Sequence, residues 1–278
     1  MSRGKLRLIK RRIESTTSTM QITRAMQMVA SARLSKVQKK INSIQEYASY
    51  AERIISKIEP DYDSPLVKPG DGTLIVVVST DMGLCGSFTG DISSHAIKEA
   101  NNCSDFKGFL VIGTKGEIEI KNYGDILLSR TKLYDIPTSD NAEYILDDIL
   151  NIVNSKKAGK VKIVYGELKN ALIQRPKTID LLPIKYESKL DTRYEYEPAP
   201  EILFKEASYL YMLSQVYRYM YETKVSELYA RQNAMKNATE NAKNLIDDLT
   251  LDYNKLRQSS ITTELIEIVN GAQALQEQ

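Results

Sequence analysis

The sequence predicts an α/β protein in which a long antiparallel coiled coil of N- and C-terminal helices is joined to a small, mainly parallel α/β domain. Three observations lead to this fold class. Both ends of the chain are long segments without proline, whose apolar residues recur three and four apart. The middle alternates β-branched runs with amphipathic stretches, which is typical of β-α-β units. Two proline-rich linkers separate the middle from the ends.

The first segment, 1–58, is expected to form one helix, because it contains no proline and only one glycine. Its apolar residues follow a heptad spacing that predicts a left-handed coiled coil. These positions are Ala30, Leu34, Val37, Ile41, Ile44, Ala48, Ala51, Ile55 and Ile58. Upstream, the apolar residues Ile22, Met26 and Val29 depart from this phase. A stutter is therefore expected where the helix changes neighbours.

A linker with Pro60, Pro65 and Pro69 leads into the α/β domain, expected over 73–185. Its first strand, Thr73 to Ser79, is a β-branched apolar run of the kind buried on both faces of a parallel sheet. The remaining pattern alternates strands with helices and predicts right-handed crossovers. Strands are expected near 109–112, 126–129, 161–165 and 179–184, and helices before about 100, near 115–122 and near 141–154.

A second linker, 186–200, precedes a very long helix expected over 201–278, which has no proline and only Gly271 as glycine. Its apolar seams are Met235, Ala238, Ala242, Leu245 and Leu249, then Ile261, Leu265, Ile268, Ala272 and Leu275. At 1.5 Å per residue it is about 110 Å long, against about 80 Å for the first helix. Both helices start from one small domain, so they must run antiparallel. The last stretch, near 261–278, then projects alone, and its apolar seam requires a protein around it.

The charges of the two ends are complementary, although the net charge is only +2. The first forty residues contain eleven Lys or Arg residues and only one acid, Glu14. From Glu240 onward, acids outnumber basic residues. The basic stretch is open to three interpretations: a solvated face, a nucleic-acid patch or a contact with an acidic protein. No aromatic residue that could stack on a base occurs before Tyr47. This favours an acidic protein partner and argues against nucleic acid.

Nothing in the sequence predicts an active site, a cofactor or a metal centre. Cys85 and Cys103 are too few for a disulfide framework and lack a metal-ligand spacing. His95 is the only histidine, so no Ser-His-Asp arrangement is supported. The Gly83-x-x-Gly86 loop lacks the Lys-Ser/Thr of a P-loop, and a tight turn between strand and helix is expected there. The absence of an apolar h-region and of a run of about 20 apolar residues predicts a soluble chain. A helix that starts almost at Met1 leaves little room for a cleavable transit sequence, so a source in the bacterial cytoplasm is expected.

Segments spread over the whole chain resemble one family, in the same order. Near the start stands Q-I-T-R-A-M-Q-M-V-A, in the middle D-M-G-L-C-G-S-F, and near the end I-T-T-E-L-I-E-I-V-N-G-A. These segments, with R-Q-N-A-M-K-N-A-T and Y-N-K-L-R-Q, are similar to motifs of the gamma subunits of F-type ATP synthases. At Met20 and Gln27 the sequence differs from the residues that are common in that family. This leaves open how strongly this region contacts the beta subunit of the synthase.

The resemblance implies a non-catalytic shaft that turns inside a ring of three alpha and three beta subunits. Its α/β domain would stand on the membrane c ring beside the epsilon subunit, at the cytoplasmic face of the bacterial membrane, with membrane association only through the complex. The implied or expected contacts with the alpha/beta ring are Met26, Arg33, Lys36, Arg257, Gln258, Leu265 and Ile268. The implied contacts with the c ring or epsilon are Tyr194, Glu195 and Glu197.

Two other functions remain open from the residues alone. The α/β core and its glycine loop would also suit a nucleotide-binding enzyme with coiled-coil arms. The heptads would also suit a coiled-coil tether, which should associate with itself.

Overall fold

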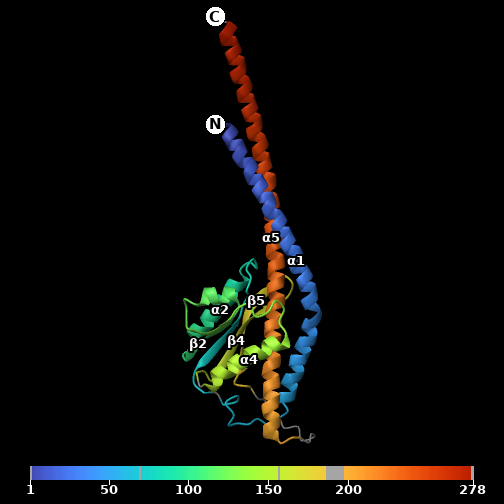
Figure 1. Cartoon of the computed structure of the whole chain (residues 1–278), viewed down its shortest axis with the longest axis vertical. Helices are drawn as coiled ribbons and strands as arrows, with labels where there is room; N and C mark the ends of the chain where they lie inside the picture. The colour runs from blue at the N-terminus through green and yellow to red at the C-terminus, as the bar shows by residue number, and fades with distance from the viewer. Residues whose placement is uncertain (1, 69, 156, 186–196, 277–278) are drawn as a thin grey trace. The chain divides into compact units, whose positions relative to one another are not determined.

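The computed structural model describes residues 2–68, 70–155, 157–185 and 197–276 (Figure 1). The chain forms two compact units, one made of Met1–Val29 with Gln232–Gln278 and the other of Ala30–Arg231. Two long helices, α1 (Ser2–Ile55) and α5 (Pro200–Gln276), contribute residues to both units. This agrees with the two long terminal helices that the sequence predicts.

The larger unit contains a five-stranded sheet with the strand order β3-β2-β1-β4-β5. The first four strands are parallel and β5 pairs with β4 in the antiparallel sense, so the prediction of a mainly parallel sheet is confirmed. The strands are β1 (Thr73–Val78), β2 (Phe106–Ile112), β3 (Ile126–Arg130), β4 (Lys160–Leu168) and β5 (Gln174–Leu182). The helices between them are α2 (Phe88–Asn102), α3 (Thr114–Ile120) and α4 (Ser139–Asn154).

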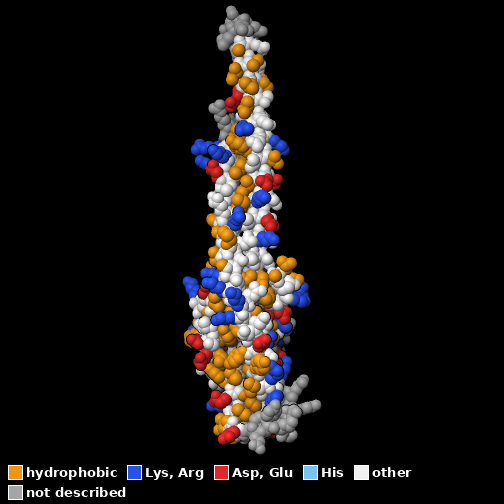
Figure 2. All heavy atoms as spheres, turned by 90° about the vertical axis from the view of Figure 1, so that its right-hand side faces the viewer, with side chains coloured by type: hydrophobic (Ala, Val, Ile, Leu, Met, Phe, Trp, Pro, Cys, Tyr) orange, Lys and Arg blue, Asp and Glu red, His pale blue; other side chains and the backbone are white. Residues whose placement is uncertain are grey.

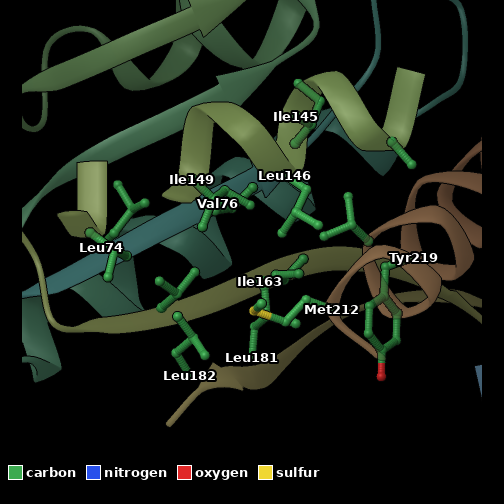
Figure 3. Close-up of a cluster of buried hydrophobic side chains, with 14 of the residues drawn as sticks. Leu74, Val76, Ile145, Leu146, Ile149, Ile163, Leu181, Leu182, Met212 and Tyr219 are labelled. Carbon is green, nitrogen blue, oxygen red and sulfur yellow. The ribbon is translucent and has the colours of Figure 1, made fainter. Parts of the chain in front are cut away.

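Helices cover both faces of this sheet, which explains its apolar strands. All six residues of β1 are buried, and alternate side chains enter two different cores. Leu74 and Val76 face α4 and α5, where Ile145, Ile149 and Met212 meet them (Figure 3). The opposite face packs against α2 and α3.

The edge strand β5 begins earlier than the sequence pattern predicts. Its first half, Gln174 to Thr178, is polar and contains Pro176, which marks it as a loop by composition. A proline lacks the backbone N–H that an interior strand needs, but an edge strand can turn that position outward. Pairing with β4 therefore overrides the local preference in this half of the strand.

In the larger unit, α1 and α5 pack together through the predicted seam. All nine apolar positions from Ala30 to Ile58 are buried. Tyr221 Oη donates to the carbonyl oxygen of Val37 at 3.0 Å, and Gln215 Nε2 donates to that of Ala48 at 3.4 Å. Because the residue numbers rise along α1 as they fall along α5, the helices are antiparallel.

The stutter expected near Met26 is wrong. Ile22 and Val29 are 60% and 55% exposed, whereas Thr23 and Gln27 are half-buried and continue the heptad phase. The seam is polar here because Thr23 Oγ1 is hydrogen-bonded to Thr239 Oγ1 at 2.8 Å. The prediction considered apolar residues only, and Ile22 and Val29 lie on the exposed side of the helix.

The seam of α5 in the smaller unit also differs from the prediction by one residue. Leu245 is exposed and Ile246 is half-buried in its place. Both residues continue the spacing of three and four, so the partner helix decides which of them is buried. The observed seam runs through Met235, Ala242, Ile246, Leu249, Tyr253, Leu256 and Ser260.

The smaller unit ends in a stretch of α5 that has no α1 residue beside it. Ser2 lies 21 residues before Thr23, and the position 21 residues after Thr239, its hydrogen-bond partner, is Ser260. Residues 261–276, the C-terminal tip, therefore extend beyond α1 by about 24 Å (Figure 1). The sequence prediction that the end of α5 projects beyond the first helix is therefore confirmed.

Candidate interaction surfaces and the filled end of the sheet

The C-terminal tip presents an exposed apolar stripe. Leu265 and Ile268 are 57% and 67% exposed, and Ile261 and Val269 are also exposed. A helix turns by about 100° per residue, so these four side chains lie on one side and Thr263 lies on the opposite side. Hydrophobic side chains are visible on this end of the chain in Figure 2. The tip can therefore bind an apolar surface without a change in its own fold.

Arg257 and Gln258 lie on α5 just before the tip, and both are exposed. Neither side chain has a hydrogen bond or ion pair within the described part of the chain. The Arg257 guanidinium is thus available to a partner. Its planar group can donate two parallel hydrogen bonds to one carboxylate.

The three predicted contact residues of α1 differ in their surroundings. Met26 is half-buried and belongs to the smaller unit. Lys36 is exposed and has no ion-pair partner among the described residues. Arg33 pairs with Asp135, its Nη1 lying 2.7 Å from Oδ1. An exposed pair of this kind contributes about 0.2–1 kcal/mol, so Arg33 can exchange this partner at small cost.

The residues implied to face the c ring or epsilon are mostly not described. Tyr194 and Glu195 lie outside the described residues, and Glu197 is exposed just before α5.

The carboxyl end of the sheet is where an open α/β fold ordinarily binds a ligand, at the point where the strand order reverses. That point lies between β1 and β4. Here side chains of α5 bind the end of β4 directly. Thr223 Oγ1 accepts from the backbone N–H of Gly166 at 3.1 Å, and Ser226 Oγ donates to the Gly166 carbonyl at 2.8 Å. Glu222 Oε1 accepts from the N–H of Leu168 at 3.2 Å. The helix thereby fills the place that a nucleotide would need.

The glycine loop after β1 is hydrogen-bonded to the neighbouring loops. Asp81 Oδ1 accepts hydrogen bonds from the N–H and Oγ1 of Thr114, at 2.9 and 2.8 Å, and from the N–H of Lys132 at 2.9 Å. Leu84 and Gly86 both have positive φ, 63° and 64°, which closes the turn into α2. One carboxylate oxygen thus joins three loops at the carboxyl end of the sheet.

A buried ionic cluster on α5 holds this loop. Arg231 donates through Nε to the carbonyl of Gly83 at 3.1 Å and through Nη2 to that of Met82 at 3.0 Å. Its Nη1 lies 2.6 Å from Glu227 Oε1, and Lys224 Nζ lies 3.1 Å from the other oxygen of Glu227. Glu227 and Arg231 are 3% and 6% exposed. Sequence reasoning missed this role, although a Glu followed four residues later by an Arg is a signal for such a pair on a helix.

A cavity of about 280 Å³ remains beside this cluster, lined by Asp81, Tyr134 and Glu227 among others. Burial raises the pKa of Tyr134, and the negative charges of Glu227 and Asp81 raise it further. The lining contains three acids, Asp81, Asp135 and Glu227, against two cations, Lys132 and Lys224, so its charge does not favour a phosphate group. Among the described residues, no group of three or more His, Cys, Asp or Glu side chains could hold a metal ion.

Glu222 provides a test of how α5 is held against β4. Burial raises the pKa of Glu222, although the hydrogen bond from Leu168 and the charge of Arg218 lower it. The folded chain therefore binds this proton more tightly than the unfolded chain, so its stability falls as the pH rises from the ordinary value of 4.5 through the raised pKa.

Glu222→Gln should remove this loss, because the amide oxygen can still accept from Leu168. We expect the Tm of the variant to exceed that of the parent chain by a few degrees at about pH 8 and the difference to shrink on acidification. Thermal unfolding followed over this pH range measures it, with the exposed Glu119→Gln as control. A gain that stays constant with pH would contradict the assignment.

No helix in the described ranges is both long and apolar enough to cross a membrane.

Comparisons with known proteins place the chain in one family. The ATP synthase family matches residues 5–275. The ATP synthase gamma chain of Clostridium botulinum strain Kyoto is 36% identical over 275 residues, which cover 96% of each chain. That of Bdellovibrio bacteriovorus is 37% identical over 290 residues, covering 97% of this chain and 98% of the relative.

Solved structures agree. A chain of the Euglena gracilis mitochondrial ATP synthase, in a structure of OSCP, F1 and the c ring, matches the fold over 98% of this chain and 95% of its own length, with a TM-score of 0.74 at 17% identity. A chain of the central stalk and c ring of the Tetrahymena thermophila mitochondrial enzyme has a TM-score of 0.59 at 26% identity, over 78% of this chain and 99% of its own. With this fold and these relatives, the chain belongs to the gamma-chain family of ATP synthases.

Proposed function

We propose that this chain is the central rotor subunit of an F-type ATP synthase. It couples ion-driven rotation of the c ring to the conformational cycle of the catalytic beta subunits, and it carries no active site of its own. The observation that carries this proposal is the C-terminal tip, an exposed apolar stripe on a helix that is bonded firmly to a sheet at its other end. A helix of this kind can transmit rotation only if another protein surrounds the tip.

The proposed partners are three alpha and three beta subunits, the epsilon subunit and the c ring. Met26, Arg33, Lys36, Arg257, Gln258, Leu265 and Ile268 are proposed to contact the alpha/beta ring, and Tyr194, Glu195 and Glu197 the c ring or epsilon. In this arrangement 1–58 and 201–278 are the shaft and 73–185 is the foot. The chain would associate with the cytoplasmic face of the bacterial membrane only through the complex.

A nucleotide-binding enzyme is the weaker alternative, because Thr223, Ser226 and Glu222 occupy the end of β4 where the ligand would lie. Nucleic acid is likewise not a proposed partner.

Co-expression with alpha and beta subunits tests the function. We expect one copy of this chain to purify with three of each in a complex that hydrolyses ATP. Calorimetry of the chain alone should show no binding of ATP at micromolar concentration. Failure to assemble, or tight nucleotide binding by the chain alone, would overturn the proposal.

Arg257→Ala should lower the turnover of the assembled complex by about tenfold, since a hydrogen bond to a charged group contributes about 1.5–3 kcal/mol. ATP hydrolysis by the purified complex measures this effect. Lys255→Ala is the matched control, because this exposed cation lies on the other side of the same helix. Equal activity of the two variants would remove Arg257 from the contact surface.

A further inference from the structure

The interior of α1 contains a run of five hydroxyl residues, Ser15 to Thr19, here called the hydroxyl segment. Ser and Thr favour a helix less than Ala does, and they are commoner at helix ends and in turns. The segment belongs to the smaller unit, together with the stretch of α5 that faces it. Nothing in the function derived so far uses it.

Four hydroxyl groups of this segment are bonded to the backbone of the preceding turn. Each donates a hydrogen bond to the carbonyl oxygen four residues earlier, at a distance between 2.8 and 3.1 Å. The donors are Thr16, Thr17, Ser18 and Thr19, and the acceptors are the carbonyls of Arg12, Ile13, Glu14 and Ser15. Because one turn of a helix has 3.6 residues, these four consecutive carbonyls surround the whole helix.

Each of these carbonyls has two donors, because the helix also directs a backbone N–H at it. A helix bends where a carbonyl tilts away from its N–H partner, and this tilt weakens their hydrogen bond. Here the hydroxyl group can keep the carbonyl bonded while the N–H moves away. Side-chain bonds of this kind often bend helices, and four of them on consecutive residues allow a bend in any direction.

The facing residues of α5 follow from the hydrogen bond between Thr23 and Thr239. In an antiparallel pair, Thr16 lies seven residues before Thr23 and is level with Ile246, seven residues after Thr239. Thr16 and Thr17 are half-buried, as is Ile246. At this level α1 therefore presents hydroxyl groups to α5, where the neighbouring turns present Ile13 and Met20.

The packing of α5 is also weak in this stretch. Between Met235 and Ile246 the only buried apolar side chain of α5 is Ala242, which is small. Three exposed residues of the same stretch are poor helix formers, namely Asn237, Asn241 and Asn244. Few apolar contacts therefore oppose a bend of the two helices at this level.

We propose that the hydroxyl segment and the facing residues 237–246 of α5 form a bending point of the helix pair. Both helices stay intact there, while residues 2–14 and 247–276 change direction relative to residues 20–29. The role of the bend rests on the proposed function, because a shaft held by other proteins at both ends needs it. It lets the C-terminal tip adopt the direction that the surrounding subunits impose on it.

The first experiment compares the purified chain with a four-alanine variant that carries Thr16→Ala, Thr17→Ala, Ser18→Ala and Thr19→Ala. After correction for the intrinsic rates of the two sequences, amide hydrogen exchange at residues 16–20 should be at least tenfold slower in the variant, since Ala favours the helix. The control variant should exchange like the parent chain there. It carries four changes at exposed positions of α1, Gln21→Ala, Ser31→Ala, Ser35→Ala and Gln38→Ala.

The second experiment measures the bend directly, with nitroxide labels at Arg7→Cys and Ala25→Cys. Both positions are exposed, and they lie five turns apart on the same side of α1, about 27 Å along the helix. The native cysteines, Cys85 and Cys103, are first replaced by Ala. Pulsed electron paramagnetic resonance should give a narrower distribution of label distances in the four-alanine variant than in the parent chain or the control. Equal widths, or equal exchange rates, would overturn the bending point.

The third experiment tests the role of the bend in the complex with alpha and beta subunits. The four-alanine variant should assemble as the parent chain does and hydrolyse ATP at less than half the parent rate. Equal turnover would overturn the proposed role of the bend. Failure of the parent chain to assemble would instead contradict the proposed function, whatever the label distances show.

Discussion

Leu265→Asp is expected to weaken the assembly of this chain with alpha and beta subunits by at least tenfold while leaving its own thermal unfolding unchanged. The side chain is 57% exposed, so a charge at this position costs the isolated fold little. In the complex the same position would lose the burial of a Leu, worth about 1.5–3 kcal/mol, and would bury a carboxylate. A loss of about 1.4 kcal/mol already corresponds to a tenfold change.

Thr263→Asp is the matched control, since it adds the same charge to the opposite side of the same turns of α5. Ile268→Asp should behave like Leu265→Asp. Assembly is measured by titrating labelled chain into alpha and beta subunits, and stability by thermal unfolding of the chain alone. If the Leu265 variant loses stability as much as assembly, or if Thr263→Asp weakens assembly equally, the tip is not a docking surface.

The long helices could be predicted from the sequence wherever apolar residues alone mark the buried face. From Ala30 to Ile58 every predicted position is buried. The prediction failed at Thr23, where a hydroxyl pair crosses between the helices, and at Leu245, where the neighbouring Ile246 is turned inward. In both places the choice of buried residue depends on the partner helix, which the local pattern does not contain.

The exposed tip could be predicted, but the internal connections could not. The exposed tip follows from unequal helix lengths, which are visible in the sequence. The hydrogen bonds that Gly166 makes with Thr223 and Ser226 join residues about 60 positions apart, and no spacing rule brings them together. Arg33 shows the converse case, because a residue expected to serve a partner is also paired with Asp135 of its own chain.

The filled end of the sheet explains how an α/β fold can serve a mechanical rather than a catalytic role. In the larger unit, α5 contacts the sheet through apolar packing and also through hydrogen bonds to the loop after β1 and to the end of β4. Apolar packing resists separation but is weakly directional, whereas hydrogen bonds to fixed carbonyl groups resist sliding and rotation of the helix. The buried cluster around Glu227 therefore fixes the orientation of the helix on the sheet.

Arg231→Met should be the most destabilising single change in this cluster. It removes two hydrogen bonds to the loop after β1 and leaves Glu227 buried with Lys224 as its remaining described ion-pair partner. Breaking a buried ion pair costs about 3–5 kcal/mol. For a chain of this size that loss lowers the Tm by about 10 °C, measured by thermal unfolding of the purified chain.

Three further variants separate the contribution of the ion pair to stability from the effect of the lost side-chain volume. Arg24→Met changes the same residue type at an exposed position and should leave the Tm unchanged. Arg231→Lys keeps the charge but cannot reach both carbonyl groups and the carboxylate, so it should fall between the parent and Arg231→Met. The double variant Arg231→Met with Glu227→Gln should recover part of the stability, because no carboxylate is then left short of its partner. A double variant less stable than Arg231→Met would show that the remaining pair of Glu227 with the buried Lys224 still stabilises the fold without Arg231.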